Sequence, residues 1–195
     1  LAQRVMNASV PEIYVIWHPT CELGGQLVPR IYAWLRPGNG LGPRVFYRSA
    51  PAPEAPKGGL PPQLPGESQR RALADVSPTA NTQICLLLID ELMIADAGWR
   101  AWIAQLGSTK QALARRIVLP VALDSTAYNV PAPLRELNFL RPVGLPLPTP
   151  STPEAFEVAA RSLLRQLTEA LCRILIGDSN AEAAPTPAAK AVGLD

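Results

Sequence analysis

Residues 12–18 read Glu12-Ile13-Tyr14-Val15-Ile16-Trp17-His18, a short apolar run that predicts a β-strand. The run ends at a polar turn, and a glycine pair, Gly24-Gly25, then opens a helix predicted over residues 26–36. A second strand is predicted over residues 44–48. Two strands with a covering helix between them form a parallel βαβ unit, and open parallel sheets bind ligands at the carboxyl ends of their strands. Residues 17–22 and 47–68 are therefore where we expect a functional site.

The middle of the chain contains its most apolar strand and a strongly patterned helix. Residues 82–90 include the unbroken run Ile84-Cys85-Leu86-Leu87-Leu88-Ile89, which is typical of a strand buried on both faces. A helix is predicted after this strand, because apolar side chains recur there at i, i+3, i+4 and i+7: Trp99, Trp102, Ile103 and Leu106. The buried strand is therefore expected at the centre of a parallel sheet.

Three further elements complete the predicted sheet. A fourth strand is expected over residues 116–121, with Pro120 at a position that needs no ladder donor. One helical turn is expected over residues 134–139 and a short fifth strand over residues 140–143. This alternation predicts an α/β fold: a three-layer α/β/α domain with a five-stranded parallel sheet of order 2-1-3-4-5, a flavodoxin-like arrangement.

The last helix has the clearest boundary signals in the chain. Ser151-Thr152-Pro153-Glu154 matches a capping box, and Gly177 ends the helix after one apolar stripe. A helix of about 22 residues is roughly 33 Å long, so its end is expected to reach a partner or a second domain. We assign residues 1–177 to one domain and the Ala- and Pro-rich residues 178–195 to a linker or tail that leads to additional domains.

Composition limits the classes of partner. The 195 residues carry a net charge of +2 with scattered Arg and Lys, without the basic stripe typical of nucleic-acid binding. No run approaches the roughly 18 apolar residues of a membrane span, so we expect a cytoplasmic protein with neither a nucleic-acid nor a membrane partner. The three cysteines, Cys21, Cys85 and Cys172, show no CxxC spacing and are expected to be buried reduced thiols.

Residue content also excludes several enzyme classes. The chain has a single histidine, His18, and no GxSxG elbow, Walker A, GxGxxG or HExxH motif. No metal-ligand spacing surrounds His18, so we expect neither a metal nor a resident cofactor. A two-component receiver needs an acidic pair after its first strand, where this chain reads Trp17-His18-Pro19. We therefore do not expect the chain to be a receiver domain.

Several of these segments together resemble a Toll/interleukin-1 receptor (TIR) domain. The family begins with an "F-I-S-[HY]" strand and a polar turn, and its second strand, "G-x-x-V-F-x-D", leads into the BB loop. Its third helix begins with "S-x-W-C", and a later strand reads "I-I-P-V". The segments that resemble these motifs are residues 13–18 with the turn to Glu22, residues 45–48, residues 86–91 with Gly98-Trp99, and residues 116–123. The resemblance covers residues 12–176.

The resemblance implies one of two activities, and the sequence leaves both open. Some family members cleave NAD+ at the nicotinamide–ribose bond with a glutamate in the third helix, whereas others only assemble, through the BB loop and neighbouring faces. Counting from Trp99 in the family's "W-C-x-x-E" motif, the glutamate position is Ile103 here, and the serine expected after the third strand is Asp90. These departures favour a signalling or effector module, of the kind used in bacterial immunity and antiviral defence, over the standard NAD+ chemistry.

The resemblance also places candidate residues in two regions. In the enzymatic alternative, an NAD+ glycohydrolase with a non-standard acid, NAD+ is the substrate, and its pocket lies between the ends of the first and third strands. Its candidate catalytic acids are Glu91, Glu22 and Asp90, with Asp124 nearby, and its candidate ligand-binding residues are Trp17, His18 and Trp99. Each acid also has a plainer interpretation as a helix cap or a solvated residue. Self-association is expected through the loop 49–68, with interaction residues Tyr47, Arg48, Lys57 and Gln63.

Overall fold

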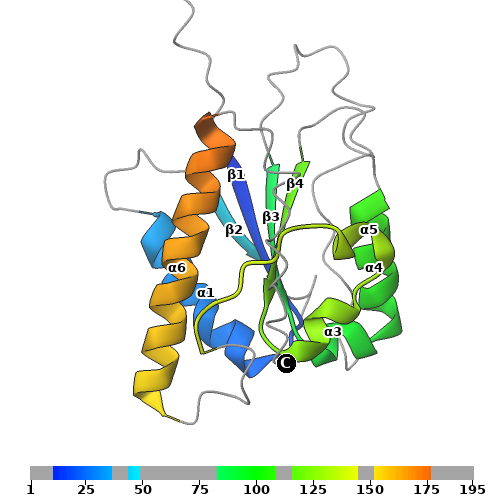
Figure 1. Cartoon of the computed structure of the whole chain (residues 1–195), viewed down its shortest axis with the longest axis horizontal. Helices are drawn as coiled ribbons and strands as arrows, with labels where there is room; N and C mark the ends of the chain where they lie inside the picture. Colours follow the sequence, from blue (N-terminus) through cyan, green and yellow to red (C-terminus); the bar gives the residue numbers. More distant parts are fainter. Residues whose placement is uncertain (1–10, 37–43, 49–82, 109–115, 145–151, 177–195) are drawn as a thin grey trace, which may run out of the picture.

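The fold was analysed in a computed structural model, which describes the segments that carry most of the predicted elements: residues 11–36, 44–48, 83–108, 116–144 and 152–176 (Figure 1). Two predicted segments lie outside these residues: the loop 49–68 and the linker or tail at 178–195.

The described strands form one parallel sheet. Its four strands are β1 (Glu12–Trp17), β2 (Arg44–Arg48), β3 (Gln83–Ile89) and β4 (Arg116–Ala122). They lie in the order β2-β1-β3-β4, and every neighbouring pair is parallel. Every residue of β3 is buried, as its unbroken apolar sequence predicted. The parallel α/β architecture is therefore confirmed for the described part of the chain.

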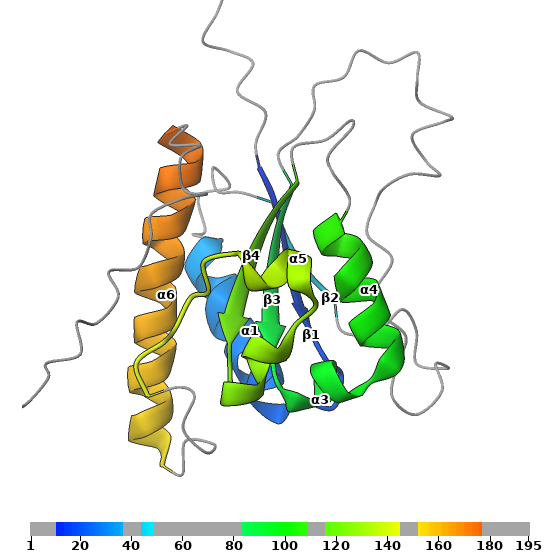
Figure 2. The ribbon, with the colours of Figure 1, turned by 45° about the vertical axis from the view of Figure 1, so that its right-hand side comes forward.

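Helices cover both faces of this sheet (Figures 1 and 2). One face carries α1 (Glu22–Leu35) and α6 (Pro153–Ile176), and the other carries α3 (Glu91–Ala95), α4 (Ala97–Ser108) and α5 (Ala132–Arg135). The alternation along β1 shows the division, because Ile13 and Val15 pack on the α1/α6 side while Tyr14 and Ile16 pack on the α4 side. The described residues thus form two apolar cores, one on each side of the sheet.

The start of α1 differs from the prediction. The helix begins at Glu22, four residues before the predicted start at 26, so Gly24 and Gly25 lie inside its first turn rather than ahead of it. The local packing gives the reason: a Cβ at Gly24 would lie only 3.0 Å from the Cβ of Trp17 and 3.2 Å from Cys21 Sγ. Gly24 therefore allows α1 to lie close to the end of β1. It does not mark the position at which the helix begins.

The predicted fifth strand is reduced to one residue in the described part of the chain. Leu140 forms a single parallel bridge with Val121, its N–H donating to the Pro120 carbonyl at 2.8 Å. The next residues leave the sheet and bind α6 instead. Gln166 accepts from the Arg141 N–H at 2.9 Å and donates to the Arg141 carbonyl at 2.8 Å, so its side-chain amide occupies both backbone groups that a strand partner would use.

We call residues 140–144 the strap. Its second attachment to α6 is the Val143 N–H, which donates to Ser162 Oγ at 2.9 Å.

Pro120 lies at a position of β4 where a proline is tolerated. Its carbonyl faces the strap, and the N–H that a proline lacks would have pointed to the same outer edge of the sheet.

Other boundaries shift by smaller amounts. A short 3-10 helix, η2 (Ser125–Asn129), follows β4 without having been predicted, and the helical turn predicted at 134–139 is α5, which starts at Ala132. The long last helix is present, and Thr152 caps it by accepting from the Ala155 N–H at 3.2 Å. The prediction of three buried thiols is wrong for Cys172, which is exposed on α6, and right for Cys21 and Cys85.

Candidate functional site

The end of the sheet where a functional site was predicted is built from residues that cap the following helices. We call it the carboxyl edge; it comprises residues 17–24, 90–99 and 123–126. Cys21 precedes α1, and its Sγ accepts a hydrogen bond from the Gly24 N–H at 3.2 Å. Asp90 precedes α3, and its Oδ1 accepts from the Met93 N–H at 3.0 Å. Both residues therefore have a structural role at a helix N-terminus.

Asp96 has the same role between α3 and α4. Its Oδ1 accepts from the N–H groups of Gly98 at 2.8 Å and Trp99 at 3.0 Å. These two amides belong to the first turn of α4, where the helix itself supplies no partner. Asp96 therefore fixes the start of the helix that carries Trp99 and Ile103.

Asp124 accepts hydrogen bonds from two different elements at this edge. Its Oδ1 accepts from the Thr126 N–H at 2.8 Å and from the Thr126 hydroxyl at 2.6 Å. Its Oδ2 accepts from the Glu91 N–H at 2.8 Å. One carboxylate therefore caps η2 and also joins the end of β4 to the beginning of α3.

Cys21 connects two of the strand ends. Its thiol is buried and hydrogen-bonded to the side chain of Asp90, which follows β3. Burial, followed by the neighbouring Asp90 carboxylate, raises the pKa of the Cys21 thiol to about 12. At neutral pH the group is therefore a protonated donor to Asp90 and not a nucleophile.

His18 is the most unusual polar residue of the carboxyl edge. It is only 4% exposed, and its ring packs on Trp99 with centroids 5.4 Å apart. Nδ1 lies 2.8 Å from Thr20 Oγ1, whereas Nε2 is buried and has no hydrogen-bond partner in the described structure. The nearest carboxylate oxygen is Asp96 Oδ2, 3.8 Å from Nε2 and beyond hydrogen-bond distance. A buried polar atom without a partner typically costs about 1–3 kcal/mol.

The predicted ligand-binding residues do not all lie together. His18 and Trp99 are in contact on the α4 side of the sheet. Trp17 packs on the α1/α6 side, over the first turn of α1 at Gly24. The sheet therefore lies between the two indole rings, because consecutive residues of a strand point to opposite faces.

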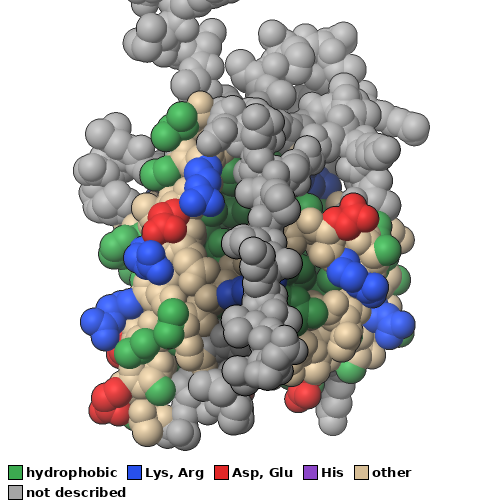
Figure 3. Space-filling view, viewed as in Figure 1, with side chains coloured by type: hydrophobic (Ala, Val, Ile, Leu, Met, Phe, Trp, Pro, Cys, Tyr) green, Lys and Arg blue, Asp and Glu red, His purple; other side chains and the backbone are tan. Residues whose placement is uncertain are grey.

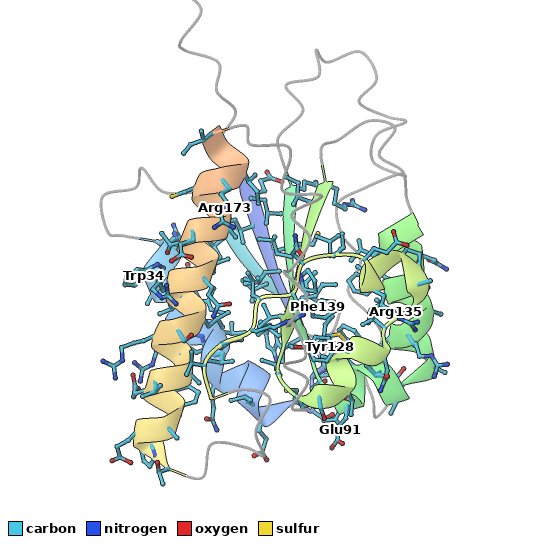
Figure 4. The ribbon with its side chains drawn as sticks, viewed as in Figure 1. Trp34, Glu91, Tyr128, Arg135, Phe139 and Arg173 are labelled. Atoms are coloured by element: carbon cyan, nitrogen blue, oxygen red, sulfur yellow. The ribbon has the colours of Figure 1, made fainter. Side chains whose placement is uncertain are left out.

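The candidate acids differ in their surroundings. Asp90 is buried and occupied by its contacts with Met93 and Cys21. Glu22 and Glu91 are exposed in the first turns of α1 and α3, where a negative charge is favourable. Figure 4 shows the Glu91 side chain directed away from the ribbon at the end of the molecule near α3.

Ile103 lies where its spacing placed it, on the inner face of α4. It is 0% exposed and belongs to the same apolar cluster as Trp99, Met93 and Ile16. Trp99 is also fully buried and lies on α4. The two positions that were aligned with the family's "W-C-x-x-E" motif, Trp99 and Ile103, therefore belong to one helix. The position that the TIR resemblance gives to a glutamate is an apolar core position in this chain.

The interaction residues are only partly described. Tyr47 and Arg48 are the last residues of β2, and their backbones pair with Val15 and Ile16 of β1. Their side chains, and all of Lys57 and Gln63, lie outside the described residues.

Sequence inspection missed two contributors to the carboxyl edge. The sequence did not predict that Asp96 or Thr126 contributes to this edge. It also did not predict the hydrogen bond that Asp124 accepts from the first residue of α3. A signal existed for Asp96, because an Asp immediately ahead of an apolar helix pattern is typical of an N-cap. No local pattern predicts the bond between Asp124 and the Glu91 N–H, since 33 residues separate them.

Searches for metal sites and for membrane spans were negative over the described residues. Within them, no three His, Cys, Asp or Glu side chains group closely enough to hold a metal ion. No helix there combines the length and apolarity needed to cross a membrane. In comparisons with known proteins, no family model, no curated protein and no solved structure matches the chain.

Proposed function

We propose that the chain is a TIR-like signalling or effector module that self-associates or binds partner domains, in a bacterial immunity or conflict system. The observation that carries this proposal is the complete burial of Ile103. A packed isoleucine has no group that transfers a proton or stabilises a developing charge, so the standard acid of NAD+-cleaving relatives has no counterpart at this position.

The strand order supports the TIR-like interpretation. The described order β2-β1-β3-β4 agrees with the first four positions of the order 2-1-3-4-5. Leu140 pairs with β4 at the position where a fifth strand would begin. We therefore propose a flavodoxin-like domain in which the strap replaces most of the fifth strand.

The contacts of the carboxyl edge also favour a module without NAD+ chemistry. Asp90, Asp96 and Asp124 each accept hydrogen bonds from backbone N–H groups at helix starts. Removing such a carboxylate from its cap to serve a substrate would leave those N–H groups without partners. Their geometry therefore fits a structural role better than general acid–base catalysis.

The proposed interaction surface begins beside this edge. β2 ends at Arg48, which pairs with Ile16 near the end of β1, so β2 ends on the same side of the sheet as the carboxyl edge. On the α6 side, charges of both signs are interspersed, as the Arg165–Glu169 pair at 3.0 Å and the Arg30–Glu157 pair illustrate (Figure 3). Such a mixed surface suits protein partners rather than a polyanion.

The enzymatic alternative needs one of the remaining acids to act on NAD+. Asp90 is buried and engaged, which leaves the exposed carboxylates of Glu91 and Glu22. Both carboxylates are exposed, whereas Trp99, the aromatic residue expected to stack on the ligand, is fully buried. We therefore rank NAD+ cleavage second.

Sedimentation velocity over a range of protein concentrations tests the proposed assembly. Wild-type protein should self-associate, and Arg48→Ala should weaken the association about tenfold or more, as expected for an arginine hot spot. The matched control is Arg173→Ala, which removes an exposed arginine from α6 (Figure 4). A protein that stays monomeric at every concentration, or that responds equally to both substitutions, would contradict the proposal.

A further inference from the structure

We propose that His18 and Asp96 form a proton-operated latch between the loop after β1 and the start of α4. In the structure the latch is open, because His18 Nε2 and Asp96 Oδ2 are 3.8 Å apart and Nε2 has no hydrogen-bond partner in the described residues. This inference is independent of the proposed function, since it concerns contacts within the fold.

The open geometry follows from the hydrogen bonding of neutral histidine. If the proton is on Nδ1, that nitrogen donates to Thr20 Oγ1 at 2.8 Å, and Nε2 and Asp96 Oδ2 face each other as two acceptors. If the proton is on Nε2, Nδ1 accepts from Thr20 and the Nε2–H is still too far from Asp96 to bond. In both tautomers the contact stays unmade.

Protonation changes this contact and keeps the one between Nδ1 and Thr20 Oγ1, at the expense of the 3.4 Å hydrogen bond that Nδ1 accepts from the Thr20 N–H. The imidazolium donates from both nitrogens, so Nδ1 keeps Thr20 Oγ1 while Nε2 gains a proton that points toward a carboxylate. Charge-assisted N–H···O bonds are about 2.7–2.9 Å long, so closure requires a movement of roughly 1 Å. The Asp96 side chain is 30% exposed against 5% for His18, so Asp96 has more room for this movement.

The latch reaches α4 through the second oxygen of the same carboxylate. Asp96 Oδ1 caps α4 by accepting from the N–H groups of Gly98 and Trp99. Trp99 in turn packs against the His18 ring. A shift of Asp96 toward His18 therefore changes the cap of α4, and the protonation state of one ring is transmitted to a helix start.

The other charged groups around His18 do not compete for this role. From its own loop, the neighbouring titratable group is the Cys21 thiol, which burial and Asp90 keep protonated by raising its pKa to about 12. Asp90, from the end of β3, is engaged by that thiol and by the Met93 N–H. On α4, Arg100 is exposed at the turn that follows the cap. Asp96 is the charged group for which a direct approach to the ring is described.

The experiment is a double-mutant cycle with His18→Gln and Asp96→Asn, measured by urea unfolding at pH 5.5 and at pH 8. Asparagine caps helices as well as aspartate does, so Asp96→Asn removes the charge while keeping the cap. The latch predicts a coupling of about fivefold in the unfolding equilibrium constant at pH 5.5, modest because Asp96 is partly exposed, and less than about twofold at pH 8. Equal coupling at both pH values, or none at pH 5.5, would overturn it.

A second measurement decides the question if His18→Gln does not fold. His18 is the only histidine of the chain, so its ring signals in an NMR titration need no assignment by mutation. We expect the amide signals of Gly98 and Trp99 to move together with the ring signals in the wild type, and not in Asp96→Asn. Cap amides that do not respond in the wild type, or that respond equally in Asp96→Asn, would refute the latch.

Discussion

Replacing Ile103 with glutamate would place an acid where the TIR resemblance expects the glutamate of NAD+-cleaving TIR domains, and we predict that it unfolds the domain instead of activating it. Ile103 is 0% exposed, so removing its side chain forfeits about 2–5 kcal/mol of burial and packing. A carboxyl group at that position must also be desolvated among Trp99, Met93 and Ile16, which adds a penalty of similar size. The total, at least about 4 kcal/mol, is a large part of the 5–15 kcal/mol that typically stabilises a domain.

The assay is urea unfolding followed by circular dichroism. With a slope of about 2 kcal/mol per molar urea, Ile103→Glu should lower the unfolding midpoint by roughly 2 M or leave no folded baseline. The matched control is Ala101→Glu, which adds the same side chain to an exposed position of the same helix and should change stability by less than about 0.5 kcal/mol. If Ile103→Glu folds with an unchanged midpoint, the position tolerates an acid, and its burial no longer argues against catalysis.

Further predictions concern the first turn of α1, the strap and the thiols. Gly24→Ala should destabilise the domain by about 1–3 kcal/mol, because the new Cβ would lie 3.0 Å from the tryptophan that ends β1. Gly25→Ala meets nothing closer than 3.9 Å and should be neutral or stabilising by up to about 1 kcal/mol, so equal melting shifts for the two variants would contradict this packing. Gln166→Ala should cost about 0.5–1.5 kcal/mol by removing both hydrogen bonds from the exposed N–H and carbonyl of Arg141 to α6, and Gln166→Glu should cost less because it keeps the acceptor; chemical unfolding that ranks them in reverse would refute the role of this amide. The pKa values of Cys21 and Cys85 are raised from 9.0 to about 12 in the folded chain, so unfolding releases protons, and the free energy of unfolding should fall as pH rises above about 9, by up to about 1.4 kcal/mol per pH unit for each thiol. Replacing both cysteines with alanine should flatten that slope, and an unchanged slope would count against the burial of the thiols.

Periodicity predicted the parts of the fold that depend on local pattern. The unbroken apolar run of β3 identified the central strand, and the spacing from Trp99 to Leu106 identified the inner face of α4. The start of α1 was missed because glycine is usually read as a helix breaker, whereas Gly24 is required by contact with Trp17. The fifth strand predicted at residues 140–143 does not form beyond Leu140, because the competing partner of Arg141 is a side chain 25 residues away, which no local pattern reveals.

The candidate site shows the same division between local and long-range information. The position of Ile103 on the buried side of α4 followed from helix geometry and did not require the structure. The separation of Trp17 from Trp99 also follows from strand alternation, but the two residues were grouped because both lie near strand ends. The contacts of Asp124 with Glu91 and of Cys21 with Asp90 depend on which strands are neighbours, so only the folded chain reveals them.

Nicotinamide release from NAD+ tests the central claim most directly, which is that the carboxyl edge is a structural junction and not a catalytic site. Purified protein is incubated with NAD+ at concentrations that extend into the range where it self-associates. We predict release no faster than in a buffer blank, because Ile103 is buried and the carboxylates of Asp90, Asp96 and Asp124 cap helices. Release above the blank that is lost in Glu91→Gln, with the unfolding midpoint unchanged, would contradict the account.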